Sequence, residues 1–166
     1  SRDRIDRLNL RIVNDIIPGS KIQVSDNWFT WSETPEQFAE SVHNSKYCFI
    51  PRGDTLSSRR LFDIVSGGCI PVMTTVQTEG GMVPFADELD YETFCVLVDE
   101  KTFLDKGLIT SLVFELMEME ETKYLELRHG LNIAREHLIY GTTGDSFIPN
   151  VKVFESYIKE IESKSD

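Results

Sequence analysis

The 166-residue sequence contains no apolar run long enough to span a bilayer, no amino-terminal signal peptide and no Asn-X-Ser/Thr sequon. It is also short of basic residues: 17 lysines and arginines stand against 28 aspartates and glutamates, for a net charge of −11. An acidic chain is a poor general ligand of nucleic acid, because phosphates require a basic footprint. We therefore expect no nucleic-acid partner, and any local basic cluster in such a chain is informative.

Cysteine and histidine are scarce, with three of each, and they form no Cys-X-X-Cys pair and no Cys/His ligand set. Cys48, Cys69 and Cys95 each lie in an apolar run typical of a buried strand. Because free cysteine is among the most buried residue types, we interpret all three as small core residues. The sequence thus predicts no metal site and no cofactor.

The length suits one domain with a substantial core and is too short for two ordinary domains. The first residues are Ser-Arg-Asp-Arg-Ile, without a methionine and without a helix cap. We therefore expect residues 1–166 to be a single domain that belongs to a longer, two-domain protein. Any targeting segment would then lie upstream.

Short apolar runs alternate with helical patterns along the chain. The runs predict buried strands at 47–50, 69–73 and 94–98, with a weaker candidate at 21–24. Helical spacing or capping signals predict helices at 2–17, 34–44, 59–66, 84–89, 105–138 and 151–161. Within the long helical region, Gly130 is a candidate break, and Leu108, Leu112, Leu116 and Met119 form a candidate core stripe.

Strands that are apolar throughout and alternate with helices predict an α/β fold. We expect a Rossmann-like parallel sheet with helices on both faces. The strands are few for such a sheet, so we also expect a leading strand upstream of Ser1.

The segment most informative about function runs from Ser45 to Asp63, as a strand, a polar loop and a helix start. Ligands of open α/β sheets bind beyond the carboxyl ends of the strands, where a helix amino terminus offers free N–H groups to a phosphate. Ser57 and Ser58 could donate hydroxyls to phosphate oxygens, Arg60 could bind a diphosphate through paired hydrogen bonds, and Asp63 could accept bonds from ribose hydroxyls.

Each of these residues also has a simpler interpretation. The serines could only cap the helix, and Asp63 could only pair with an arginine at helical spacing. Arg59 and Arg60 could be solvated or ion-paired arginines, although two cations oppose the macrodipole at a helix amino terminus. The tripeptide Arg52-Gly53-Asp54 also matches an integrin-binding motif, without the structural context that would support adhesion.

Three linked motifs resemble the carboxyl-terminal signature of exostosin-like glycosyltransferases. They are Lys-Tyr-Cys-Phe-Ile-Pro-Arg-Gly-Asp at 46–54, Ser-Ser-Arg-Arg-Leu-Phe-Asp at 57–63, and Ser-Gly-Gly-Cys-Ile-Pro-Val at 66–72. Pro84-Phe85, Leu89-Asp90-Tyr91 and the run at 94–98 continue the match, which covers about residues 35–98.

The resemblance implies the nucleotide-sugar-binding, carboxyl-terminal half of a GT-B fold. By position, it implies that Arg52, Ser58 and Arg60 contact the diphosphate and Asp63 the ribose, while Gly53 lets the backbone approach the ligand. It further implies inverting transfer from a UDP-sugar to the hydroxyl of a glycan or glycoprotein, with the catalytic base in the amino-terminal domain. A membrane-anchored protein of the Golgi lumen is the implied setting.

One position departs from the family pattern. Met82 precedes Val83-Pro84-Phe85 where many relatives carry an acidic residue, and the preceding loop at 78–81 is lengthened. Two alternatives to an active donor-binding domain therefore stay open. One is a non-catalytic nucleotide-sugar-binding or scaffolding module, and the other is a nucleotide-binding α/β domain of a different transferase.

Overall fold

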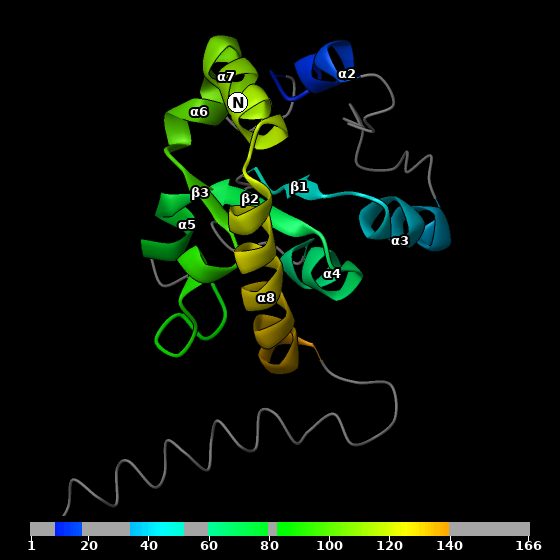
Figure 1. The fold of residues 1–166 in the computed structure, drawn as a ribbon, viewed down its shortest axis with the longest axis vertical. Coiled ribbons are helices and arrows are strands. Elements are labelled where there is room, and N and C mark those ends of the chain that lie inside the picture. Colours follow the sequence, from blue (N-terminus) through cyan, green and yellow to red (C-terminus); the bar gives the residue numbers. More distant parts are fainter. Residues whose placement is uncertain (1–8, 18–33, 52–59, 80–82, 140–166) are drawn as a thin grey trace, which may run out of the picture.

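The computed structural model of the chain describes residues 9–17, 34–51, 60–79 and 83–139 (Figure 1). The candidate strand at 21–24 and the expected helix at 151–161 lie outside these ranges. In chain order the elements are α2 (Ile12–Ile16), α3 (Pro35–His43), β1 (Tyr47–Phe49), α4 (Arg60–Gly67), β2 (Ile70–Thr74), α5 (Thr75–Glu79), the 3₁₀ helix η1 (Tyr91–Thr93), β3 (Val96–Val98), α6 (Glu100–Leu104), α7 (Lys106–Met117) and α8 (Glu121–Leu138).

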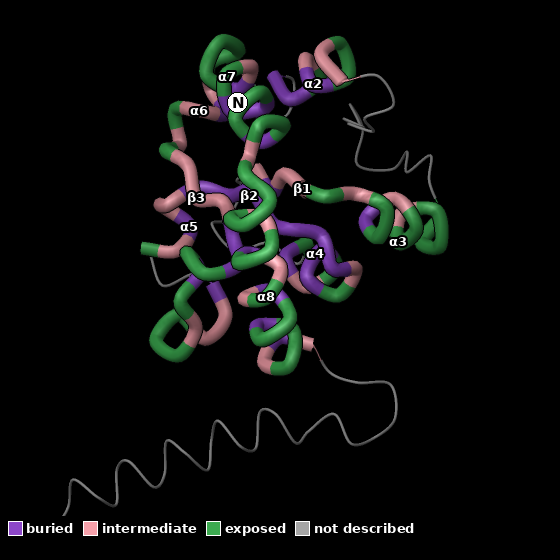
Figure 2. The backbone as a smooth tube through the Cα atoms, in the orientation of Figure 1, coloured by how far each residue is buried: buried purple, intermediate pink, exposed green. Residues whose placement is uncertain are grey.

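The three strands form a parallel sheet in the order β1-β2-β3, which confirms the predicted α/β class. The central strand β2 is buried over its whole length (Figure 2), whereas β1 and β3 are half-buried. Pairing of β2 with β3 starts at Val72 opposite Val96, one residue after Pro71. Proline has no N–H to contribute to a ladder, which fits the start of that pairing after Pro71.

Helices cover both faces of the sheet. One cluster of buried side chains joins α3, α4 and α8 to the sheet, and a second joins α2, α6 and α7 to it. On β2 the adjacent residues Met73 and Val72 alternate between the two clusters: Met73 packs with the first and Val72 with the second. This alternation follows from the two-residue period of a strand and makes a three-layer arrangement.

Helix α3 begins as the sequence predicts. Thr34 is its N-cap, and Pro35 occupies the first turn. The backbone N–H of Gln37 donates to Thr34 Oγ1 at 3.3 Å, and the Thr34 N–H donates to Gln37 Oε1 at 2.9 Å. This reciprocal capping box satisfies two of the free donors at the helix start.

The long helical region expected at 105–138 is not one helix. The chain forms two helices there, α7 and α8, which are separated by residues 118–120. Glu120 adopts an extended backbone that ends any continuous helix. Gly130 does not interrupt α8. A Cβ at Gly130 would overlap the carbonyl oxygen of Thr93, so glycine allows α8 to lie against the chain that leads into β3.

The expected core stripe on α7 is also partly wrong. Leu112 and Leu116 are buried, but Leu108 is 47% exposed and Met119 is only half-buried. The buried face of α7 consists of Ile109, Leu112, Val113 and Leu116. Leu108 lies in the first turn beside the N-cap Asp105, whose carboxylate accepts a hydrogen bond from the Leu108 N–H at 3.1 Å.

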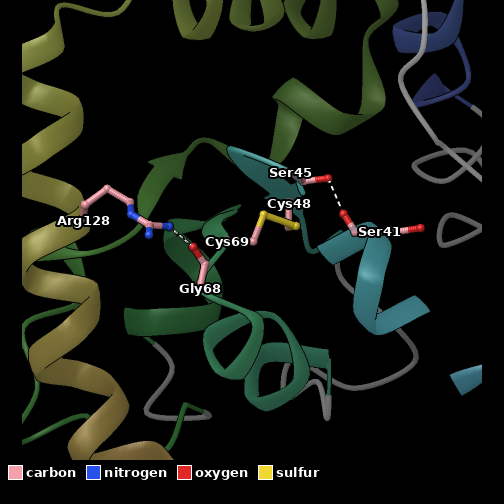
Figure 3. Close-up of a disulfide and its surroundings, with 6 residues drawn as sticks. All are labelled: Ser41, Ser45, Cys48, Gly68, Cys69 and Arg128. Atoms are coloured by element: carbon pink, nitrogen blue, oxygen red, sulfur yellow. Dashed lines mark hydrogen bonds between the residues drawn. A yellow bond between two sulfur atoms is a disulfide. The ribbon is translucent and has the colours of Figure 1, made fainter. Parts of the chain in front are cut away.

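Cys48 and Cys69 form a disulfide, which corrects their interpretation as free core residues (Figure 3). Their Cα atoms are 5.9 Å apart and they are 21 residues apart in sequence, on β1 and at the residue before β2. Parallel pairing of β1 with β2 brings the two cysteines together. Cys48 lies opposite Pro71, and Cys69 precedes Pro71 by only two residues. Cys95 is free and buried, as predicted.

The segment expected as a helix at 84–89 forms a turn instead. Phe85 has a left-handed backbone (φ 55°), and its carbonyl accepts hydrogen bonds from the N–H groups of Glu88 and Leu89. The hydroxyl of Tyr91 donates to the Pro84 carbonyl at 2.8 Å. Burial raises the pKa of Tyr91, so this phenol stays protonated and can remain the donor. A left-handed residue in the first turn is incompatible with an α-helix there.

Candidate functional site at the carboxyl edge of the sheet

The carboxyl ends of the three parallel strands lie at one edge of the sheet, and α4 begins on that side. It follows β1 and precedes β2 in the chain, so the parallel topology makes it run back from the side of the carboxyl end of β1 to the amino end of β2. Open α/β sheets bind ligands outside the carboxyl ends of their strands. The topology therefore places the amino end of α4 where a ligand would be expected.

Arg60 is the first residue of α4, and Asp63 follows one turn later; both are exposed. Leu61, Ile64 and Val65 form the buried face of the same helix. Helical spacing puts Arg60 and Asp63 together on the outer side of α4, because residues three apart are neighbours on a helix surface. An exposed guanidinium at a helix amino terminus is compatible with binding an anion there.

The other predicted site residues, Arg52, Gly53, Ser57 and Ser58, lie outside the described residues, as does Met82. Their roles remain predictions from the sequence and the resemblance. What the structure adds is the position of their neighbours: Ile50 is buried in the core after β1, Pro51 is the last described residue before them, and Arg60 opens α4.

The sequence did not reveal a polar pair at the carboxyl end of β2. Thr74 and Gln77 are both buried, and Gln77 Oε1 accepts from the Thr74 N–H at 2.9 Å and from its hydroxyl at 3.0 Å. This pairing ties the first turn of α5 to β2. Thr78 and Glu79 belong to α5, which corrects the first half of the loop expected at 78–81; residues 80 and 81 lie outside the described ranges. The signal available in the sequence was a glutamine three residues after the threonine that follows the apolar run at 69–73.

The carboxyl end of α4 closes with a Schellman motif. The Gly68 N–H donates to the Val65 carbonyl at 3.1 Å, and the Cys69 N–H donates to the Ile64 carbonyl at 3.2 Å. Gly68 has φ 78°, the left-handed conformation that such a helix end requires. The helix predicted at 59–66 thus ends at Gly68, and Gly67 is still inside α4.

Two arginines of α8 reach the same end of α4. Arg128 Nη1 donates to the Gly68 carbonyl (Figure 3), and Arg135 Nη2 donates to the Ser66 carbonyl at 2.9 Å. Sequence reasoning missed both residues. Two arginines seven residues apart around a buried leucine, Leu131, were a usable signal, because that spacing puts them on one helix face.

Among the residues that the structure describes, no group of three or more His, Cys, Asp or Glu side chains is arranged to hold a metal ion. Burial raises the pKa of the Cys95 thiol well above its ordinary value, so it is not a thiolate nucleophile at neutral pH. In the described part of the chain, no helix is long and apolar enough to cross a membrane.

Comparison with known proteins gives a match to the model of the Exostosin GT47 domain over residues 11–113, more than half of the chain. A probable arabinosyltransferase of Arabidopsis thaliana is 31% identical over 101 residues, which are 61% of this chain and 21% of that protein. A probable glycosyltransferase of the same plant is 34% identical over 100 residues, 60% of this chain and 19% of that protein.

Exostosin-1b of Danio rerio is 36% identical over 67 residues, 40% of this chain and 9% of that protein. The chain therefore spans about a fifth or less of the length of these three relatives. The matched family region contains the sheet, α4 and the amino-terminal part of the α6–α7 segment.

Proposed function

This chain belongs to the exostosin GT47 family, and we propose that it is the donor-binding part of a glycosyltransferase. The donor is a nucleoside diphosphate sugar, most simply a UDP-sugar carrying a hexose or a pentose. The acceptor is a hydroxyl of a glycan or glycoprotein. An amino-terminal domain of the same protein completes the active site and supplies the catalytic base.

One observation supports this proposal above the others: α4 begins at the carboxyl side of a parallel sheet with an exposed arginine. Eight residues separate Ile50–Pro51 from Arg60, and they include Arg52, Gly53, Ser57 and Ser58. A loop of this kind followed by a helix start supplies N–H groups, hydroxyls and guanidinium groups to a diphosphate. Asp63, exposed one turn later on α4, is the proposed acceptor of hydrogen bonds from the ribose hydroxyls.

In the proposed reaction the leaving diphosphate gains negative charge as the glycosidic bond to it breaks. Arg60, Arg52 and the amino end of α4 would stabilise that charge in the transition state. A base outside this chain would take the proton of the acceptor hydroxyl, which attacks the anomeric carbon with inversion. The chain itself therefore binds the donor and lowers the barrier to departure of the diphosphate.

The disulfide between Cys48 and Cys69 supports an oxidising compartment as the location of the protein. Disulfides persist in oxidising compartments and are rare in the cytosol. We propose the Golgi lumen, with the full-length protein anchored in the membrane by a segment outside this chain.

Met82 keeps one alternative function open, a non-catalytic nucleotide-sugar-binding or scaffolding module. The enzyme and the non-catalytic module would both bind the donor, so only turnover of the donor distinguishes them. Release of UDP from a UDP-sugar by the full-length protein, with an acceptor present, supports the enzyme. Donor binding without any release of UDP supports the alternative.

The donor site itself is tested by titrating UDP into the chain and following backbone amide signals by NMR, which detects weak binding. We expect UDP to shift signals of residues 60–63, and Arg60→Ala to remove most of the binding. Lys123→Ala is the matched control, because Lys123 is exposed on α8 and pairs with Glu126. Equal UDP affinity of the wild type and Arg60→Ala would contradict the proposal, and equal affinity for ADP and UDP would favour another nucleotide-binding domain.

A further inference from the structure

Three contacts converge on the short junction between α4 and β2. Arg135 donates to the Ser66 carbonyl. Figure 3 shows the other two contacts: Arg128 donates to the Gly68 carbonyl, and Cys69 is bonded to Cys48. All three contacts are therefore made within the four residues 66–69. The carboxyl end of α4 is therefore fixed by α8 and by β1.

A fourth contact fixes the same end from the side of α3. A Cβ at Gly67 would overlap the Val42 side chain, so glycine allows α3 and α4 to pack closely there. With Leu61, Ile64 and Val65 in the core, the helix has little freedom to tilt or slide.

The helix is short enough for its two ends to move together. Its eight residues make a rod of about 12 Å at 1.5 Å per residue, or just over two turns. A displacement at Ser66–Gly68 is therefore transmitted to Arg60 and to the backbone N–H groups of the first turn. A diphosphate site is sensitive to such displacement, because charged hydrogen bonds need donors at fixed distances.

The arginines are suited to this task by their chemistry. The last carbonyls of a helix lack partners within the helix and carry the negative end of its dipole, so cationic donors bind them well. Arg128 and Arg135 are two turns apart on α8, and Leu131 between them is fully buried. Packing of Leu131 thus sets the position of the helix from which both guanidinium groups reach α4.

We infer that Arg128 and Arg135 are positioning residues for the donor: they hold the carboxyl end of α4 so that its amino end meets the diphosphate. The inference rests on the proposed function, since it assigns the ligand of α4 to a nucleoside diphosphate. Neither arginine touches the donor. Each acts through the carbonyl that it holds, from the opposite end of the helix.

The test measures UDP affinity by NMR titration of the whole chain, at a temperature where every variant is folded by circular dichroism. Arg128→Ala should weaken UDP binding by up to roughly tenfold, the value reached if most of the contribution of one hydrogen bond from a charged donor is coupled to the ligand. Arg135→Ala should weaken it less, because its bond is exposed. Arg128→Lys keeps a cationic donor and should recover part of the affinity.

Two controls distinguish an effect on the position of α4 from a general loss of stability and from the loss of one positive charge. Asp105→Ala removes the cap of α7, which packs on the other face of the sheet, and lowers stability away from this junction, so UDP affinity should not change. Lys123→Ala removes one positive charge from the same helix as the arginines without touching α4, and it too should bind UDP normally.

The outcomes are distinct. Loss of UDP affinity in the arginine variants, with both controls normal, supports the inference. Wild-type affinity in Arg128→Ala and Arg135→Ala, with a lower melting temperature only, overturns it and leaves the proposed function intact. If Arg128→Ala does not fold, Arg128→Met takes its place, because it keeps a long apolar stem but has no donor for the Gly68 carbonyl; wild-type affinity and unshifted signals of residues 60–63 in that variant overturn the inference equally. A wild-type chain that binds no UDP refutes the proposed function, and the inference with it.

Discussion

At its carboxyl end α4 is held by arginines of α8, a neighbouring disulfide and close contact with α3, whereas its amino end starts at an exposed arginine. The first end follows the rules of helix stability: a left-handed glycine closes it and cations bind its last carbonyls. The second end departs from them, because a cation opposes the macrodipole at a helix start. One helix thus has an end built for stability and an end suited to an anion.

The contrast with α3 makes the same point. Thr34, Gln37 and the acidic Glu36 give α3 a favourable start, and hydrogen bonds to the backbone and Thr34 lower the pKa of Glu36. Helix α4 starts instead with Arg60, in a chain that is otherwise acidic. If the two ends of α4 have separate roles, variants at one end should change stability and variants at the other should change ligand binding.

The largest expected effect comes from removing the disulfide. Replacing Cys48 and Cys69 by alanine opens a loop that encloses every predicted site residue, and should lower the free energy of unfolding by about 3 kcal/mol. Urea denaturation followed by circular dichroism measures it. Reduction of the wild type by dithiothreitol is the matched comparison and should give a similar midpoint. Coincident unfolding curves of the oxidised and reduced wild type would refute this prediction.

The next effect is expected at Gly130, which allows α8 to approach the chain before β3. Gly130→Ala gains helix propensity of about 1 kcal/mol, but overlap with the Thr93 carbonyl costs about 3 kcal/mol, for a net loss of about 2 kcal/mol. Thermal and urea unfolding both report the change.

Gly107→Ala is the control for that experiment. A Cβ there would meet Asp105 Oδ1 at 3.1 Å, and a side chain can relieve such a contact more easily than a backbone carbonyl can. Its unfolding midpoint should stay near the wild-type value. If Gly130→Ala were as stable as Gly107→Ala, the close approach of α8 to Thr93 would be disproved.

A smaller effect is expected at Gly68. Its φ of 78° is unfavourable for residues with a Cβ, but an added Cβ would meet nothing closer than Arg128 Nη1 at 3.6 Å. Gly68→Ala should therefore cost only the conformational term of about 1 kcal/mol, and Gly68→Asn less, since asparagine tolerates the left-handed region. Equal unfolding midpoints for all three proteins would show that the left-handed helix end contributes nothing.

These residues also show what could be learned before the structure was known. The strands were predicted to within a residue or two because their runs are apolar throughout, and the caps at Thr34 and Gly68 carry short-range signals. The break between α7 and α8 has no such signal, since Glu-Met-Glu at 118–120 are good helix formers. The turn at Phe85 depends on tertiary context that overrides helix propensity.

Contacts between distant residues were the harder part. The disulfide joins positions 21 residues apart, and only the register of β1 against β2 shows that they are neighbours. The contact of Arg128 with Gly68 spans 60 residues and depends on where α8 crosses the sheet. By contrast, the position of Arg60 at the start of a helix after a buried strand followed from local pattern alone.

The smallest expected effect on stability is at Arg60, and it separates the two ends of α4 most directly. Arg60→Gln removes a cation from the positive end of the macrodipole, which favours folding by about 0.3–1 kcal/mol. It also removes the contacts of an exposed guanidinium, which contribute about 0–1 kcal/mol, so the free energy of unfolding should stay within about 0.5 kcal/mol of the wild type. UDP binding should nevertheless be largely lost, whereas Lys123→Gln, with the same change of charge on α8, should keep both properties. A variant Arg60→Gln that loses stability as the Gly68 variants do, and still binds UDP, would mean that both ends of α4 serve the fold alone.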